Sequence, residues 1–174
     1  TVFHIAAVSR VTDADLTPEY TREINQTGIP DFIEKCGRKR KIILASSKEV
    51  YGNSIDEVFE YSPKNPISLY AITKNEMEKI AEDFFYRGFD ISIIRFSTVF
   101  GGMNDHPTRV IPLFIRLALN NRPLTIIGDT KLVFPTYVDA VSECVKNFSL
   151  HENTGIVEKM VIRNFIANGI LLID

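Results

Sequence analysis

The sequence is poor in cysteine and has no marked excess of charge. Its 174 residues include only Cys36 and Cys144, too few for a disulfide framework or a zinc site, so we expect a reducing, cytoplasmic environment. Twenty Lys and Arg against 22 Asp and Glu give a net charge of −2, which argues against a protein that coats nucleic acid or an anionic membrane. No apolar run approaches a membrane span, and no signal-peptide layout is present.

Glycine is also sparse where a nucleotide-binding turn would need it. None of the nine glycines fall in the G-x-G-x-x-G or Walker spacing, so this sequence contains no phosphate-cradling loop of either kind. The sequence opens at Thr1 inside an apolar run and without a starting Met. We therefore expect an internal fragment or a truncated gene product.

The sequence has the composition of an α/β protein and an alternation of strand and helix patterns. Apolar residues make up 45% and charged residues 24%, the ordinary proportions of a globular domain. Three short runs, residues 1–5, 41–45 and 90–96, are almost continuously apolar, which is typical of parallel strands covered on both faces. Helical patterns separate them, and this order predicts a doubly wound parallel sheet.

The helical patterns differ in clarity. Residues 68–88 carry an apolar stripe of Ile72, Met77, Ile80, Ala81 and Phe84, with Ser68 as a candidate N-cap. Residues 18–37 could form a helix broken at Pro30. Beyond the third strand we expect a helix over 112–121, a short strand over 124–127 and a helix over 137–148, whereas residues 151–174 receive no assignment.

Tyr70 and Lys74 stand four residues apart on the clearest helix, so both side chains lie on one face. A nearby ammonium favours phenolate and lowers the pKa of a tyrosine from about 10, which makes the hydroxyl usable as a general acid or base. The alternative is a surface tyrosine beside a solvated lysine.

Ser46 and Ser47 follow the second strand, at the edge of the sheet where such folds bind ligands. A hydroxyl there can hydrogen-bond a substrate oxygen while its charge changes. The alternative is a pair of polar loop residues that satisfy backbone groups. A strand, a serine pair and then a helix with Tyr and Lys, in this order, are much less frequent by chance than either part.

These segments together resemble the extended short-chain dehydrogenase/reductases, the NAD-dependent epimerase/dehydratase group that acts largely on nucleotide sugars. The resemblance runs from residue 1 to about residue 148. It rests on VFHIAA (2–7), NQTG (25–28), ASSKEVYG (45–52), NPISLYAITK (65–74), IRFSTVFG (94–101), RVIPLFIRLALNNRPLTIIGD (109–129) and YVDAV (137–141).

The resemblance implies roles for individual residues. Tyr70 would be the acid/base at a sugar hydroxyl, Lys74 would lower its pKa and hold the nicotinamide ribose, and Ser47 would hydrogen-bond the reacting oxygen. Thr98 and Arg109 would contact substrate together with Ser47. The positions that would contact the cofactor, NAD or NADP, are Ile5, Ala6, Ala7, Asn25, Ala45, Tyr70, Lys74 and Phe96.

The sequence departs from the family pattern in several places. Thr98 stands where an Asn is frequent, and the stretch 131–136 lacks the Arg that clamps the substrate diphosphate, a part that Arg109 or Lys131 could take. The family's glycine-rich turn precedes the strand that matches residues 2–7. The scattered histidines carry no metal-ligand spacing, so we predict no metal site.

The sequence therefore predicts an α/β protein containing the C-terminal half of a Rossmann-like doubly wound parallel sheet and part of a small substrate-binding region. Residues 1–100 would be the partial dinucleotide-binding domain, 101–150 the partial substrate-binding region and 151–174 an unassigned tail.

We expect a nucleotide-sugar epimerase or dehydratase, homo-oligomeric at full length, with neither nucleic acid nor membrane as a partner. The chain alone would be inactive, and its unpaired strand edges would favour aggregation or association. The alternative is a non-catalytic member or fragment that binds a nucleotide or a protein. The sugar and the reaction type are left open.

Overall fold

The computed structural model describes residues 1–53, 58–102, 105–126, 135–150 and 159–161. The chain divides into two compact units, one built on Thr1–Phe96 with a short strand from the C-terminal part, and one built on Ser97–Phe148. This division does not test the functional boundary expected at residue 100, which stays a prediction. No helix within the described ranges combines the length and apolar character needed to cross a lipid bilayer.

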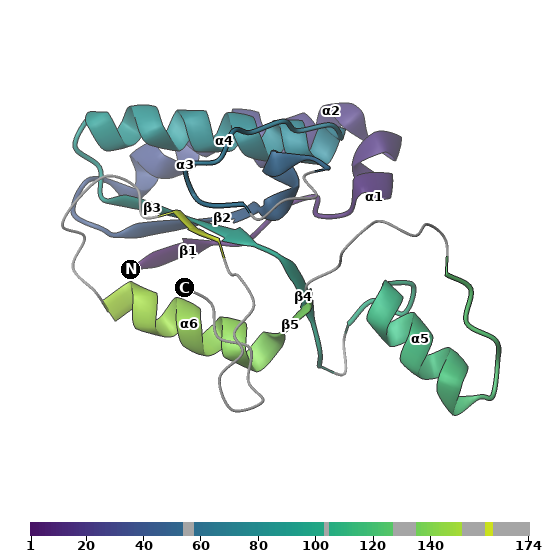
Figure 1. The fold of residues 1–174 in the computed structure, drawn as a ribbon. Coiled ribbons are helices and arrows are strands. Elements are labelled where there is room, and N and C mark those ends of the chain that lie inside the picture. Colours follow the sequence, from purple (N-terminus) through teal and green to yellow (C-terminus); the bar gives the residue numbers. More distant parts are fainter. Residues whose placement is uncertain (54–57, 103–104, 127–134, 151–158, 162–174) are drawn as a thin grey trace. The chain divides into compact units, whose positions relative to one another are not determined.

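The first unit contains a four-stranded parallel sheet in the order β1-β2-β3-β6 (Figure 1). Its strands are β1 (Val2–His4), β2 (Ile42–Ser47), β3 (Ile91–Phe96) and β6 (Lys159–Val161). All six residues of β2 and the first five of β3 are buried, which explains their continuous apolar runs. The parallel sheet is confirmed, and β6 comes from the segment that received no assignment.

The segment between β1 and β2 forms shorter helical pieces than expected. These are α1 (Val11–Leu16), α2 (Pro18–Arg22), a π-helical turn η1 (Glu23–Thr27) and α3 (Ile29–Cys36). The predicted break is real, but it precedes Pro30, which lies in the first turn of α3 where its missing N–H has no helical partner. Helix α1 was not expected from the sequence.

Helix α4 (Leu69–Tyr86) confirms the strongest helical pattern. Ser68 caps it, because its Oγ accepts a hydrogen bond from the backbone N–H of Ala71 at 3.1 Å. Met77, Ala81 and Phe84 are buried as expected, whereas Ile72 is 43% exposed. Ile72 falls on the opposite side of the helix because the buried face is shared by Tyr70, Lys74 and Glu78, which recur every four residues.

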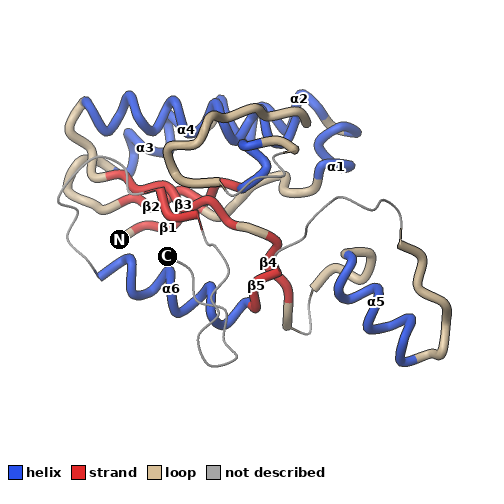
Figure 2. Tube along the Cα trace, in the orientation of Figure 1, coloured by secondary structure: helices blue, strands red, loops and turns tan. Residues whose placement is uncertain are grey.

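Helices α3 and α4 lie on the same side of the sheet and enclose the main core (Figure 2). The core consists of ten buried apolar residues from these two helices, from β2, from β3 and from the turn before β3. They are Ile29, Ile33, Ile42, Leu44, Met77, Ala81, Phe84, Phe89, Ile91 and Ile93. This packing fixes the rotation of α4, and with it which residues face the carboxyl end of β2.

The second unit pairs β4 (Thr98–Phe100) in parallel with β5 (Pro135–Tyr137) and also contains α5 (Val110–Leu119) and α6 (Val138–Leu150). The two predicted helices therefore exist with shifted bounds, and Pro112 is the third residue of α5 rather than the first. The predicted strand over 124–127 is wrong for residues 124–126, which have no regular structure, while residue 127 lies outside the described ranges. The apolar residues Leu124 and Ile126 are exposed, Ile126 at 77%, so burial does not hold them in a sheet.

Candidate active site

The carboxyl end of β2 presents two serines whose hydroxyls have different partners. Ser47 is buried, and its Oγ accepts a hydrogen bond at 3.2 Å from the backbone N–H of Glu49, so it caps the short 3-10 helix η2 (Lys48–Tyr51). This is the local bond expected of a polar loop residue, but a hydroxyl that accepts one bond still carries an O–H to donate. Ser46 instead donates to Glu78 Oε1 at 2.6 Å. Ser47 therefore keeps a donor at the strand end.

Tyr70 and Lys74 occupy one buried face of α4. Tyr70 lies in the first turn and is 9% exposed, and Lys74, one turn later, is 2% exposed. The Lys74 ammonium donates to the backbone carbonyl of Ala45 at 2.8 Å, two residues before Ser47. The alternative of a surface tyrosine beside a solvated lysine is therefore wrong, because both side chains are buried and this bond holds Lys74 against the end of β2.

Burial makes Lys74 an unusual lysine. Removal of its ammonium from water lowers its pKa from 10.5 to about 8, and the negative charge of Glu78 partly opposes that fall. Most Lys74 side chains are therefore still protonated at neutral pH, inside the protein and one turn from Tyr70. His4, at the end of β1, also has a lowered pKa, first because of burial and second because of the Lys74 charge. The positive charge of Lys74 thus acts on the ends of both β1 and β2.

This pKa predicts that Lys74 destabilises the fold at neutral pH. The unfolded chain keeps its proton up to about pH 10.5 and the folded chain only up to about pH 8, a difference worth about 3 kcal/mol at pH 7. Between those pH values the unfolded state binds more protons, so the wild-type stability rises with pH and the cost disappears near pH 10.5. Lys74→Met removes this cost but also loses the hydrogen bond to Ala45, which contributes about 1 kcal/mol. We therefore expect Lys74→Met to raise the free energy of unfolding at pH 7 by about 1–2 kcal/mol.

Urea unfolding at pH 7 and near pH 10 would measure this difference, which should shrink at the higher pH. Lys79→Met is the matched control, because Lys79 lies on the same helix but is exposed and pairs with Glu76. A Lys74→Met protein less stable than the wild type at pH 7 would contradict the assigned burial cost.

The remaining positions expected to contact cofactor lie at strand ends or beneath them. Ile5 is 68% exposed just after β1, and Phe96 ends β3 half-buried. Asn25 is 1% exposed, and its amide bonds both the N–H and the carbonyl of Val8, at 2.9 and 3.0 Å, and Thr73 Oγ1 at 3.2 Å. Asn25 thus ties the segment after β1 to α4, a role that the sequence did not indicate. Contact with a cofactor stays a prediction for all of these residues.

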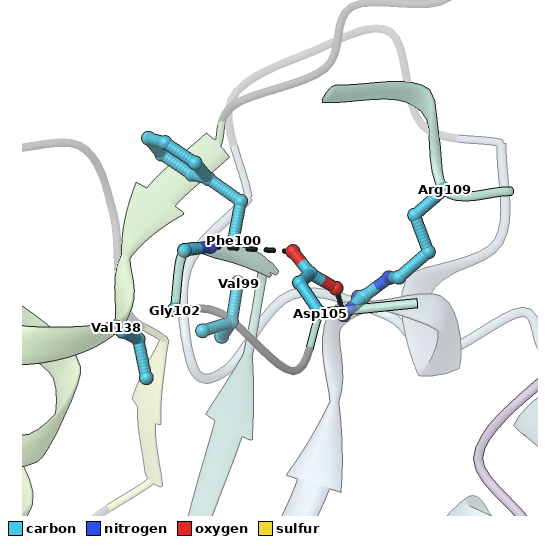
Figure 3. A pocket seen from close by; sticks show the side chains of 7 residues that line it. Val99, Phe100, Gly102, Asp105, Arg109 and Val138 are labelled. Atoms are coloured by element: carbon cyan, nitrogen blue, oxygen red, sulfur yellow. Dashed lines mark hydrogen bonds and ion pairs between the residues drawn. The ribbon is translucent and has the colours of Figure 1, made fainter. Parts of the chain in front are cut away.

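The second unit has a pocket of about 360 Å³ that contains Arg109 but not Thr98 (Figure 3). Asp105 organises it, because one carboxylate oxygen accepts from the backbone N–H of Gly101 at 3.2 Å and the other bonds Arg109 Nη1 at 3.2 Å. Gly101 has φ +113°, and a Cβ at this position would overlap the ring of Tyr137. The pocket is lined by Val99, Phe100, Gly101, Gly102, Asp105, Arg109 and Val138.

The sequence analysis did not single out Asp105, Glu78 or Arg95, the arginine of β3 that forms a buried ion pair with Glu78. The adjacent glycines 101 and 102 could have indicated a tight turn beside a pocket, and Arg95 interrupts an otherwise apolar strand. Lys131, the alternative to Arg109, lies outside the described residues. Nowhere in the described part of the chain do three or more His, Cys, Asp or Glu side chains gather so as to hold a metal ion.

Known proteins share this sequence pattern and fold. The model of the NAD dependent epimerase/dehydratase family matches residues 1–145. Human dTDP-D-glucose 4,6-dehydratase is 40% identical over 131 residues, which cover 73% of this chain and 37% of that protein. Among solved structures, MoeE5 in complex with UDP-glucose and NAD superposes with a TM-score of 0.82 at 28% identity, covering 95% of this chain and 56% of that one.

A second solved structure, the UDP-glucuronic acid 4-epimerase of Bacillus cereus with UDP-glucuronic acid and NAD, has a TM-score of 0.75 at 28% identity and covers 91% of this chain and 51% of its own. The chain thus spans between about a third and somewhat over half of the length of these relatives. Their fold is the Rossmann-like α/β fold expected from the sequence. Because the family match covers most of its residues, the chain belongs to the NAD-dependent epimerase/dehydratase family.

Proposed function

We propose that the chain is the catalytic part of an NAD-dependent epimerase or dehydratase that acts on a nucleotide sugar. The observation that carries the proposal is the buried ammonium of Lys74, bonded to Ala45 at the strand end that also bears Ser47, and one helical turn from Tyr70. The relatives whose names give dTDP-glucose, UDP-glucose or UDP-glucuronic acid support the substrate class.

In this proposal the three residues have separate tasks. Tyr70 takes the proton from a sugar hydroxyl, or returns it, because the neighbouring ammonium favours its phenolate. Ser47 donates its O–H to the reacting sugar oxygen, and Lys74 supplies the positive charge and a donor for the nicotinamide ribose. NAD, when bound, supplies hydride exchange with the sugar carbon.

The residues at the carboxyl edge of the sheet suit the nicotinamide end of this cofactor. Exposed Ile5 and Ala6 leave an apolar surface after β1, and the charge of the buried Lys74 acts on His4, the last residue of that strand. The residues that would hold the cofactor are Ile5, Ala6, Ala7, Asn25, Ala45, Tyr70, Lys74 and Phe96. This sequence has no glycine-rich loop for the pyrophosphate, because none of its glycines has dinucleotide-binding spacing. We therefore propose that residues outside this chain cradle the pyrophosphate and that the chain alone does not turn over.

The Arg109 pocket is the proposed place of the substrate's nucleotide portion. A guanidinium can bond a diphosphate through two parallel N–H donors, which suits an anionic substrate. Asp105 holds Arg109 at the pocket wall before substrate arrives. Thr98, Ser47 and Arg109 stay proposed substrate contacts, and a cytoplasmic location and a homo-oligomeric full-length protein stay predictions.

The test is conversion of nucleotide sugars by the full-length polypeptide that carries this chain. Supplied with NAD and, separately, UDP-glucose, UDP-glucuronic acid and dTDP-glucose, it should convert at least one of them to an epimer or a keto sugar, measured by chromatography and NMR. The 174-residue chain by itself is the control and should convert none. A full-length protein that binds NAD but consumes no nucleotide sugar would contradict the proposal and favour a non-catalytic binding protein.

A further inference from the structure

An ion pair between Glu78 of α4 and Arg95 of β3 lies inside the first unit. Both side chains are 0% exposed. Arg95 Nε donates to Glu78 Oε1 at 2.8 Å and Nη2 donates to Oε2 at 2.6 Å, which makes a two-pronged contact. This pair clamps the helix that bears Tyr70 and Lys74 to the strand beside β2.

Each partner of the pair also holds a second segment. The Glu78 carboxylate accepts a hydrogen bond from Ser46 Oγ at 2.6 Å and pairs with Lys64 Nζ at 2.7 Å. Arg95 Nη1 donates to the hydroxyl of Tyr51 in η2 and to the backbone carbonyl of Glu60, the latter at 2.9 Å. The network thus joins α4, β3, the end of β2, η2 and the segment around residues 60–64.

Stability alone gives no reason for this network. A buried ion pair must recover the loss of hydration of two charges, and replacement of such pairs by apolar residues is often neutral or stabilising. The position of the network indicates a functional role instead. Glu78 lies one turn after Lys74, and Ser46 directly precedes Ser47. Ser47 in turn caps η2, the helix that contains Tyr51. Three of the segments that it fixes, the end of β2, η2 and α4, adjoin a candidate catalytic residue or bear one.

We propose that Glu78 is a positioning residue that acts through Ser46 and Arg95 to hold the Ser47 end of β2 and η2 against the Tyr70–Lys74 face of α4. This inference rests on the proposed function for the roles of Ser47, Tyr70 and Lys74. Its geometric content, a fixed strand end and η2, is independent of any reaction.

Glu78 also places a negative charge beside Lys74. Among the described residues, Glu78 on α4 acts on the charge of Lys74 and His4 on β1 responds to it, while β2 contributes the neutral carbonyl of Ala45. Tyr70, one turn before Lys74, is a further titratable group on the same buried face of α4. Burial lowers the pKa of Lys74 and the Glu78 charge raises it. Glu78 therefore keeps Lys74 protonated to a higher pH, which a purely structural support would not do.

The experiment compares Glu78→Gln with Glu76→Gln in the full-length polypeptide, without substrate. Glu76 is the matched control because it lies on the same helix but pairs at the surface with Lys79. NMR of labelled lysine, with the Lys74 signal assigned by its loss in Lys74→Met, gives the midpoint of the Lys74 titration. Hydrogen exchange with mass spectrometry reports on residues 46–53 and 58–65.

We expect Glu78→Gln to lower the Lys74 midpoint by about one pH unit and to speed exchange in both segments on the order of tenfold, with neither change in Glu76→Gln. Ser46→Ala keeps the ion pair and therefore the fold, so it carries the test if Glu78→Gln does not fold. It should speed exchange over residues 47–51 and leave the Lys74 midpoint nearly unchanged. Unchanged exchange at the strand end and η2 in Ser46→Ala, or an unchanged Lys74 midpoint in a folded Glu78→Gln protein, would overturn the proposal. Neither readout requires turnover, so failure of the proposed function is detected separately.

Discussion

Under the proposed function, Tyr70→Phe is expected to reduce the turnover of the full-length polypeptide by about 10²–10⁴-fold while NAD affinity stays nearly the same. Phenylalanine fills the same space in the first turn of α4 but has no hydroxyl to exchange a proton with the sugar. Lys74 keeps its bond to Ala45 in this variant, so its proposed contact with the nicotinamide ribose is preserved. Steady-state conversion of the preferred nucleotide sugar and a separate NAD titration would measure the two quantities.

The chain offers a close control for this substitution. Tyr86 is the last residue of the same helix and is 76% exposed, so Tyr86→Phe should leave both turnover and affinity unchanged. If Tyr70→Phe kept most of the activity, the acid/base role would belong to another group. If it lost NAD affinity in proportion to turnover, Tyr70 would hold the cofactor and not serve in proton transfer.

The second large effect concerns stability. Glu78→Leu is expected to lower the free energy of unfolding by about 3–5 kcal/mol, because it leaves the buried guanidinium of Arg95 without its counter-ion. The double variant Glu78→Leu/Arg95→Met should recover most of this loss, since the guanidinium of Arg95 is then no longer buried without a counter-ion. The buried ammonium of Lys74 loses the Glu78 charge equally in both variants. Lys64, with 22% of its side chain exposed, can turn to water in both variants. Urea unfolding at pH 7 measures the free energies.

The exposed pair of Glu34 and Arg87 provides the comparison, and Glu34→Leu should change the unfolding free energy by less than about 1 kcal/mol. The pH dependence follows from the same pair. Burial alone would raise the pKa of Glu78, but the hydrogen bonds and charge of Arg95 hold it below its ordinary value of 4.5. The stabilisation is therefore complete above pH 4.5 and is lost as the pH falls through the lower, folded-state pKa. A double variant as unstable as Glu78→Leu would contradict this account.

The sequence was sufficient for the elements whose physics is local. Strands β2 and β3 are continuous apolar runs because both of their faces are covered, and α4 has a periodic stripe and the cap residue Ser68. The pairing of Tyr70 and Lys74 was recognisable for a similar reason, because residues four apart on a helix share a face. Ser47 was recognised from its place at the end of a predicted strand.

The elements that depend on distant partners were not predictable in this way. Strand β6 has three residues and exists through its pairing with β3, more than sixty residues earlier in the sequence. Glu78 and Arg95 are charged residues within apolar patterns, and only the packing of α4 on the sheet shows that they meet. Ile72 was assigned to the buried face because it is apolar, but the polar residues of that face decide its direction. Hydrophobic patterns in the sequence therefore do not predict polar contacts inside the protein.

The most direct test of the proposed chemistry is the absorbance of enzyme-bound nicotinamide in the first turnover after mixing with the preferred nucleotide sugar. With Tyr70 and Lys74 acting as proposed, the full-length wild-type enzyme shows a rapid, substrate-dependent appearance of reduced nicotinamide, and Tyr70→Phe slows it by about 10²-fold or more. Reduction of the nicotinamide at the wild-type rate in Tyr70→Phe would contradict the assignment of Tyr70 as the group that accepts the sugar's proton.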